Sequence, residues 1–198
     1  RSPFVDRACP PEETFERVSP YLRQFGIMRL ARHTSLDRIG VPVWCAYAPN
    51  SRSIVVAQGK GLTDSDARTS AVMEGLERAV AGDPGVASRF TDRATLLSEG
   101  AAAEPLGELL ALGRAAPADS DMLDWLPGHE LIQNQPAYVP RDAALLDRTR
   151  RDNRYWMSSD GLASGNTTKE AMLHGILERI ERDAFVLWQV TSVERRYR

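Results

Sequence analysis

The 198-residue sequence has two cysteines and three histidines, and its opposite charges nearly cancel. Two cysteines are too few for a disulfide scaffold or a cysteine-based zinc site, which is typical of a reducing compartment such as the cytoplasm. The formal net charge of −2 gives no overall attraction to nucleic acid or anionic lipid. There is no run of about 18 apolar residues, which is the length needed for a membrane span. We therefore expect a cytoplasmic protein that binds neither nucleic acid nor membrane.

The two ends of the sequence also lack familiar features. Residues 1–13 contain no apolar signal-peptide segment and are too acidic for a transit peptide. The chain begins without methionine and stops at Arg198, directly after a strongly helical stretch, so we expect a fragment of a longer protein. Its length suits one domain with a hydrophobic core, or two very small domains. We predict a single, incomplete domain over residues 1–198, with a variable connecting segment over residues 82–122.

Local patterns predict a mixture of helices and strands. Strands are expected over residues 27–34, 41–49 and 53–58, and a hairpin over residues 125–140 with its turn near Asn134. Helices are expected over residues 11–26 (re-entered at Pro20 and ended by Gly26), 63–81 and 167–191, with weak helices over 92–99 and 105–113. Because strands and helices do not alternate strictly, the pattern favours the α+β class.

A turn-and-helix unit occurs twice in the sequence. A shift of 104 positions aligns GKGLTDSDARTSAVMEGLER, residues 59–78, with residues 163–182 without a gap. Glycine, threonine, acidic, apolar and arginine positions agree together, which chance does not readily produce. The equivalent pairs include Gly61 and Gly165, Thr63 and Thr167, Asp66 and Glu170, Val72 and Ile176, Glu74 and Glu178, Glu77 and Glu181, and Arg78 and Arg182. We interpret this as a duplicated structural unit.

Each copy opens with a capping box at the start of its helix. The threonine is the predicted N-cap, and the acid three residues later, Asp66 or Glu170, reaches back to the threonine amide. The free amides at such a helix start are a natural seat for phosphate, and Lys60 in the GKG loop adds a positive charge. The chain has neither a GxxxxGK[ST] loop nor a kinase signature, so any nucleotide site is of another kind.

The acidic residues of each copy share one face of their helix. At about 100° per residue, Ser70, Glu74 and Glu77 lie together on the first helix. Glu170, His174, Glu178 and Glu181 lie together on the second. Both acidic faces border the apolar side, where a carboxylate is costly unless a cation neutralises it.

Two interpretations of these acidic faces stay open. In one, the carboxylates form ordinary ion pairs with Arg78, Arg179 and Arg182. In the other, the two helices face each other, and their four glutamates bind two or more Mg²⁺ ions that bridge a triphosphate. Because the arrangement occurs twice, we favour the second interpretation.

Several motifs together resemble the YcaO family. They are SLDRIGVPVW, QGKGLT, SAVMEGLER, SSDGLASGNTTKEA and LHGILERIERDA, and they cover about residues 27–81 and 153–188. The resemblance implies a fold of mixed sheets with packed helices. It also implies an ATP-dependent enzyme that acts on backbone amides of a peptide. In this family a nucleophile adds to the amide carbonyl, ATP phosphorylates the oxygen and phosphate leaves, which gives an azoline, a thioamide or an amidine.

The resemblance also implies ATP and Mg²⁺ as cofactors and specific ligands for them. Members of the family run to about twice this length, so we expect about half of the site here, which leaves activity of the isolated chain open. No catalytic residue is assigned. We assign Glu74, Glu77, Glu178 and Glu181 to the metal, and Lys60, Ser70, Asn166, Glu170 and Arg182 to ATP.

The sequences of residues 33–62 and 154–167 are similar to those of YcaO proteins that occur beside TfuA-like partners. We therefore rank thioamide formation first, azoline-forming cyclodehydration second and an accessory role in ribosomal-protein methylthiolation third. A non-catalytic nucleotide-binding scaffold is the alternative from another class. The expected partners are a peptide or protein substrate and a TfuA-like protein or another modification enzyme. A homodimer stays open.

The remaining reactive and aromatic residues give weaker signals. Cys45 lies in an apolar run and is expected to be a small buried residue. His174 either contacts phosphate or metal, or is a surface histidine without a role. Tyr155 and Trp156 are expected in the core. Cys9, His33 and His129 carry no functional signal.

Overall fold

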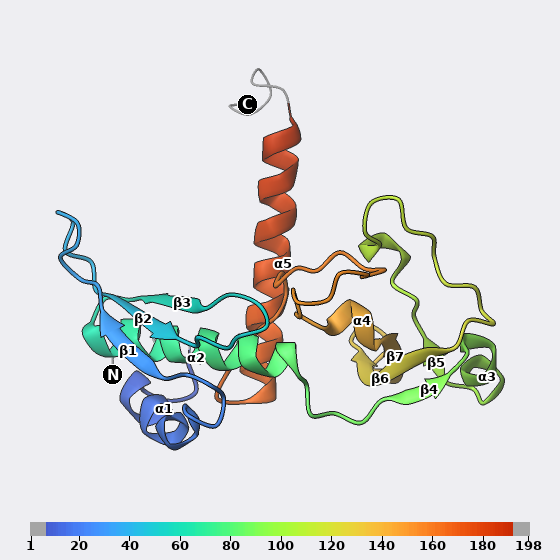
Figure 1. Ribbon diagram of the computed structural model, residues 1–198, viewed down its shortest axis with the longest axis horizontal. Helices are drawn as coiled ribbons and strands as arrows, with labels where there is room; N and C mark the ends of the chain where they lie inside the picture. Colours follow the sequence, from blue (N-terminus) through green and yellow to red (C-terminus); the bar gives the residue numbers. More distant parts are fainter. Residues whose placement is uncertain (1–6, 192–198) are drawn as a thin grey trace. The chain divides into compact units, whose positions relative to one another are not determined.

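The computed structural model describes residues 7–191. They form two compact units, shown in Figure 1: unit 1 combines residues 7–79 with residues 159–191, and unit 2 is Val80–Ser158. Both units mix helices and strands, so the predicted α+β class is confirmed. Whether the two units make up the single incomplete domain that we expect stays a prediction.

Unit 1 begins with a short helix that tightens into a 3₁₀ turn. The α1 helix (Pro11–Val18) has proline at its first position, where the missing amide costs nothing. It leads into η1 (Ser19–Tyr21) at Pro20, and Gly26 follows with a φ of 75°, a conformation that glycine adopts without strain. The predicted change at Pro20 is confirmed, but the helix expected to run to Gly26 ends at Tyr21, and turns connect it to Gly26.

A three-stranded antiparallel sheet follows. Its strands β1 (Arg29–Arg32), β2 (Val43–Tyr47) and β3 (Val56–Lys60) lie in the order β1-β2-β3. Each corresponds to one of the predicted strands. The register places Tyr47 opposite Arg29 on one side and opposite Val56 on the other.

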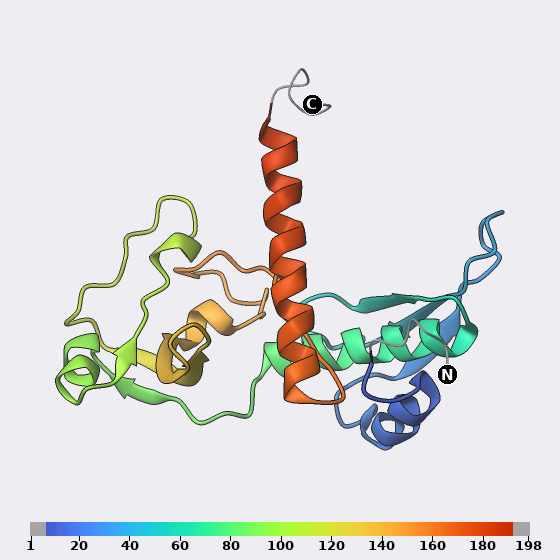
Figure 2. The same cartoon turned by 180° about the vertical axis from the view of Figure 1, so that it is seen from behind.

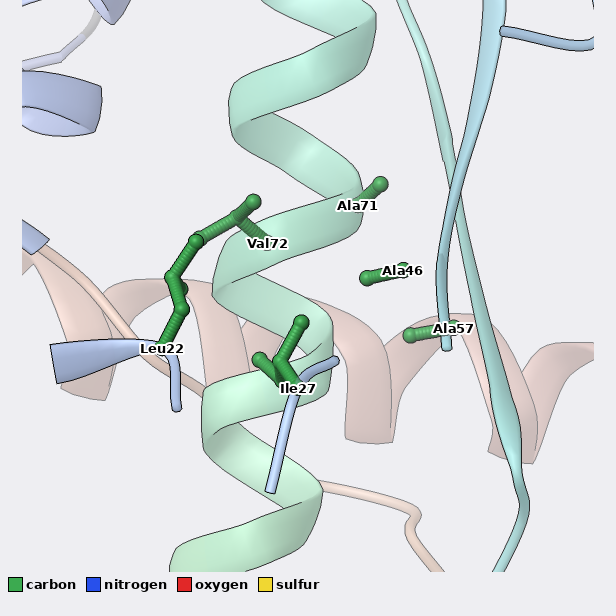
Figure 3. Packing of buried hydrophobic residues seen from close by; sticks show 6 residues of the cluster. All are labelled: Leu22, Ile27, Ala46, Ala57, Ala71 and Val72. Carbon is green, nitrogen blue, oxygen red and sulfur yellow. The ribbon is translucent and has the colours of Figure 1, made fainter. Parts of the chain in front are cut away.

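The core of unit 1 lies between this sheet and α2 (Asp64–Gly82). Figure 3 shows Ala46 and Ala57 on the strands pointing toward the helix. Leu22 and Ile27 pack against the same helix from the segment that leads into β1. Full burial of a leucine or isoleucine side chain stabilises a fold by roughly 1.5–3 kcal/mol, and that of an alanine by less. The 2-residue period of the strands and the 3.6-residue period of α2 therefore place one continuous apolar surface between them.

The second copy of the duplicated unit leads into α5 (Thr168–Val190), the long red helix in Figures 1 and 2. It begins directly after Thr167, as predicted. Gly175 is the buried residue of α5. A Cβ on Gly175 would lie 2.7 Å from the carbonyl oxygen of Gly161, so the loop and the helix approach closely here.

Unit 2 contains a four-stranded sheet in the order β4-β6-β7-β5. Its strands are β4 (Arg89–Thr91), β5 (Ala102–Ala103), β6 (Leu123–Glu130) and β7 (Gln135–Pro140), and its α-helices are α3 (Arg93–Ser98) and α4 (Arg141–Ala144). The β6–β7 hairpin turns at Asn134, whose φ is 55°, so the predicted hairpin is confirmed. Leu96, Ala103 and Trp125 form the centre of the unit 2 core.

Two local predictions in unit 2 are wrong. The helix expected over 105–113 is replaced by η2 (Gly107–Leu109), because the left-handed conformations of Leu106 and Gly113 interrupt helical geometry on both sides. Trp156 is 67% exposed although Tyr155 beside it is buried, since neighbouring side chains in an extended segment point to opposite sides. The segment 82–122 also supplies β4, α3 and β5.

None of the helices described over residues 7–191 combines the length and apolar character needed to cross a membrane.

Candidate functional site

The two copies of the duplicated unit line one cavity of about 550 Å³ in unit 1. Its walls come from α2, from the loop 159–166, from the start of α5 and from the N-terminal segment 7–14. Eight of the nine predicted site residues line it: Lys60, Ser70, Glu74, Glu77, Asn166, Glu170, Glu178 and Arg182. Glu181 is the exception within the described part of the chain, and its side chain is exposed.

Glu74 is held by donors on both of its carboxylate oxygens. The Gln58 amide on β3 donates to Oε2 at 3.0 Å, and Arg78 Nη2 forms a short ion pair with Oε1. Arg78 Nη1 also donates to the Val56 carbonyl at 3.2 Å. The carboxylate is therefore fixed against strand β3.

Glu178 is held in a similar way in the second copy. The Gly161 amide donates to its Oε2 at 2.9 Å, and Arg182 Nη2 lies 3.6 Å from its Oε1. Arg182 also pairs with Asp160 at 3.4 Å. The predicted ion pairs of Arg78 and Arg182 thus form, while Arg179 pairs with Asp160 at 3.9 Å.

The negative charges of both held carboxylates, Glu74 and Glu178, act on Glu77. Burial raises the pKa of Glu77 to about 7, against the opposing effect of hydrogen bonds with Ser164. The negative charges of Glu178 and Glu74 are a smaller part of the same rise in pKa. A divalent cation at this position would offset the same repulsion and favour the ionised form.

Glu170 binds the N-terminal segment across the cavity wall. Its carboxylate accepts from Arg7 Nη1 and from the Ala8 amide, each at 3.2 Å. Burial alone would raise the pKa of Glu170, but these two donors and Asn166 outweigh it and lower that pKa. Thr14 Oγ1 in turn donates to Asn166 Oδ1 at 2.9 Å.

The two predicted capping boxes therefore differ. In the first copy, Thr63 and Asp66 cap each other, with amide-to-oxygen distances of 3.1 Å in both directions. In the second copy, Thr167 Oγ1 accepts from the Glu170 amide at 3.1 Å, but the Glu170 carboxylate is engaged by Arg7 and Ala8. The first box is confirmed, and the second is confirmed only for its threonine.

Sequence reasoning missed the contribution of the N-terminal segment. Arg7, Cys9 and Thr14 all line the cavity. Thr14 lies on the predicted helix and residues 7–10 precede it, but no local signal places this segment beside the second copy of the repeat. His174 is exposed and also lines the cavity, in agreement with its position on the acidic face.

A second polar cluster lies on the sheet. His33 Nδ1 is 3.4 Å from Cys45 Sγ, and His33 Nε2 is 2.9 Å from the Tyr47 hydroxyl. Cys45 is buried, as predicted, and burial together with the charge of Glu74 raises the pKa of its thiol. A buried, protonated thiol is a poor nucleophile, so we interpret this cluster as structural. It links His33, directly after β1, to Cys45 and Tyr47 on β2.

The donors in the cavity fit a metal-bound phosphate in kind. Carboxylate, hydroxyl and amide oxygens are the ligands that Mg²⁺ prefers, and Lys60 and Arg182 suit phosphate oxygens. Over residues 7–191, no three His, Cys, Asp or Glu side chains are close enough together to hold a metal ion. The carboxylates are held by arginines and amides, so the metal assignment of Glu74, Glu77, Glu178 and Glu181 stays a prediction.

Comparison with known proteins identifies the class of this fold. The "YcaO cyclodehydratase, ATP- and Mg²⁺-binding" family model matches residues 58–198. The YcaO structure from Methanopyrus kandleri, bound with AMPPCP and Mg²⁺, has a TM-score of 0.69 and 26% identity over 90% of this chain and 44% of that one. A heterocyclase in complex with substrate and cofactor shares the fold, with a TM-score of 0.72 and 23% identity over 93% of this chain and 29% of that one.

Curated relatives lead to the same family. A Rhizobium leguminosarum bv. trifolii protein in the tfuA 3′ region is 40% identical over 98% of this chain and 46% of the relative. A protein from Methanothermobacter thermautotrophicus is 31% identical over 92% of this chain and 48% of the relative. The chain thus spans less than half the length of these relatives. It belongs to the YcaO family, and ATP and Mg²⁺, which the sequence predicts as cofactors, are those in the description of that family.

Proposed function

We propose that the chain contributes ATP and Mg²⁺ ligands to an enzyme that activates backbone amides of a peptide by O-phosphorylation. The observation that carries this proposal is the shared cavity, because a duplicated motif brings Glu74, Glu77 and Glu178 to one place. An amide oxygen is a poor leaving group, and phosphorylation by ATP converts it into phosphate. Catalysis of this type depends mainly on positioning and on offsetting negative charge.

Each group in the cavity has a distinct task in this proposal. Glu74, Glu77 and Glu178 supply hard oxygen ligands for Mg²⁺. Arg182 and Lys60 supply positive charge for phosphate oxygens, and Arg182 can do so with two parallel donors. Ser70, Asn166 and Glu170 offer further polar contacts to the nucleotide. Glu181 is exposed and lies outside the cavity wall. It can bind the metal only if its side chain or the middle of α5 moves toward the cavity.

The product that we propose is a thioamide, formed with a TfuA-like partner. Support comes from the 40% identical relative in the tfuA 3′ region. Azoline formation is the second candidate, because the matching family model is described as a cyclodehydratase. The two products differ in mass, since a thioamide exchanges oxygen for sulfur whereas an azoline loses water. A peptide or protein substrate and a cytoplasmic location are part of the same proposal, and a homodimer stays open.

Calorimetry of ATP with Mg²⁺ tests the site directly. Glu77→Gln keeps the size and hydrogen-bonding capacity of the side chain but removes its charge. We expect it to lower the affinity for ATP in the presence of Mg²⁺ by about 10-fold or more, and to abolish ATP hydrolysis where the wild type hydrolyses ATP. Glu181→Gln is expected to do the same only if Glu181 joins the site.

The matched control is Glu99→Gln in unit 2. Glu99 forms an exposed pair with Arg89 and does not belong to the duplicated motif, so its loss should leave the affinity for ATP with Mg²⁺ unchanged. Equal ATP affinity in wild type and Glu77→Gln, with both proteins folded by circular dichroism, would refute the assignment. Binding without hydrolysis under all conditions would favour the nucleotide-binding scaffold.

A further inference from the structure

Arg78 joins two structural elements at the edge of the candidate site. Its guanidinium contacts the Glu74 carboxylate through Nη2 and the Val56 carbonyl through Nη1. Its side chain is only 16% exposed, and that of Glu74 is 29% exposed. Such a partly buried arrangement is screened less by water than an ordinary surface pair. Arg78 therefore anchors a carboxylate on α2 to the backbone of β3.

The arrangement around Glu74 leaves little freedom to its carboxylate. Each oxygen has one fixed donor, the Gln58 amide for Oε2 and Arg78 for Oε1. A carboxylate has about four lone-pair sites, so one remains on each oxygen. Glu74 can therefore accept a metal ion while both present donors stay in place.

The second copy repeats this arrangement. Glu178 receives a backbone amide from Gly161, and the arginine one turn later, Arg182, contacts its other oxygen. The anchor of the arginine differs, since Arg78 binds the neutral Val56 carbonyl whereas Arg182 binds the Asp160 carboxylate. The positive charge of Arg182 is thus shared between two carboxylates, those of Glu178 and Asp160. What the two copies have in common is that each held glutamate accepts from one backbone amide and pairs with one arginine.

We propose that Arg78 is a positioning residue that holds Glu74 in the orientation needed to bind a divalent cation. The proposal rests on the proposed function, because it takes Glu74 as a metal ligand. Mg²⁺ demands near-ideal octahedral geometry, so a ligand that rotates freely binds it poorly. Partners that orient a metal ligand typically contribute 10–100-fold to metal affinity. The planar fork of arginine can contact both Glu74 and Val56, which a single ammonium group cannot do with the same geometry.

A competing effect has the opposite sign. Arg78 is a cation, and its charge alone would repel a divalent ion nearby. If charge were its main influence, removal of Arg78 would tighten metal binding. Positioning and charge therefore predict opposite results for a neutral variant, and different results for a lysine variant.

The experiment measures Mn²⁺ binding to the whole chain with ATP present, by the loss of the free Mn²⁺ signal in electron paramagnetic resonance beyond the loss that the same concentration of ATP causes without protein. Arg78→Gln removes the charge and the fork, and Arg78→Lys removes only the fork. We expect both variants to raise the apparent Kd for Mn²⁺ by about 10-fold. The control is Arg32→Gln, which removes an exposed arginine paired with Asp64 at the start of α2 and should leave the Kd for Mn²⁺ unchanged.

Each outcome decides the matter. Tighter Mn²⁺ binding by Arg78→Gln, or wild-type binding by Arg78→Lys, would overturn the positioning role while leaving the proposed function standing. A wild-type chain that binds no Mn²⁺ with ATP would overturn the proposed function and this inference together. If Arg78→Gln does not fold, the folded Arg78→Lys variant still separates positioning from charge. ATP affinity without metal serves as the second measurement, and it should be equal in all folded variants.

Discussion

The two copies of the duplicated unit have closely similar sequences but very different surroundings. Val72 on α2 is completely buried, whereas its counterpart on α5, Ile176, is 43% exposed. The same holds along the helices, because α2 contributes Ala67 and Ala71 to buried positions while Gly175 is the buried residue of α5. The apolar pattern therefore predicts which face of a helix can pack against other elements. It does not show whether that face is buried in this chain.

The close contact between helix and loop is conserved between the copies by a reversed pair of small residues. In the first copy, Gly59 on β3 lies against Ala71 on α2. In the second, the equivalent positions are Ala163 and Gly175, and they are again in contact. The glycine has thus moved from the strand side to the helix side. A close approach between the elements occurs in both copies, while the position of the glycine that allows it differs.

Substitution of these glycines should produce the largest effect. A Cβ on Gly59 would lie 2.1 Å from two backbone atoms of α2, Ala67 O and Ala71 N. Neither atom can move without displacement of the helix, so we expect Gly59→Ala to lower the free energy of unfolding by about 3 kcal/mol or more. At Gly175 the nearest backbone atom would be 2.7 Å away, and Gly175→Ala should cost about 1–2 kcal/mol. Urea unfolding of both variants checks the order, and equal losses would contradict it.

Truncation of the equivalent apolar residues should separate the copies next. Val72→Ala removes two buried carbon groups and leaves a cavity, for an expected loss of about 2 kcal/mol. Ile176→Ala removes more carbon, but from a side chain that is already about half in water, and it should cost less than about 1 kcal/mol. Urea unfolding with an unchanged m-value makes the comparison valid. A larger loss from Ile176→Ala would show that α5 is covered in solution.

Much of the fold follows from local sequence. The strands around Trp44 and Val56 have the expected β-branched or aromatic residues and the turn residues between them, and both long helices have their threonine caps. What local sequence does not contain is pairing between distant segments. The two-residue strand β5 exists only because Ala102 and Ala103 pair with β7, and a strand that short has no period to detect.

The candidate site was predictable to the extent that it is periodic. Glu74, Glu77 and Glu178 share a cavity because helical spacing fixes their faces. The contact of Arg7 with Glu170 spans 163 positions in sequence and depends on the path of the N-terminal segment, which no motif encodes. Glu181 aligns with Glu77 in the repeat but is exposed and does not line the cavity, so its assignment to the metal stays a prediction.

The pH dependence of stability offers the finest comparison between Glu77 and Glu181. Burial raises the folded-state pKa of Glu77 from 4.5 to about 7. The protonated form is therefore favoured in the folded protein, and this contribution to stability is complete below pH 4.5 and is lost as the pH rises through 7. Without metal, we expect the wild type to lose roughly 1 kcal/mol between pH 4.5 and 7 relative to Glu77→Gln, since partial exposure screens the shift. Urea unfolding with a chelator present measures this difference.

The matched substitution Glu181→Gln makes the result specific to the buried copy. Glu181 is exposed, so its replacement should not alter the slope of stability against pH between 4.5 and 7. Divalent cation with ATP should abolish the slope for Glu77, because a bound cation favours the ionised carboxylate in the folded state. A wild type whose stability runs parallel to that of Glu77→Gln across this range would show that Glu77 is already solvated. The partly buried carboxylate of Glu77 would then no longer distinguish the first copy from the second.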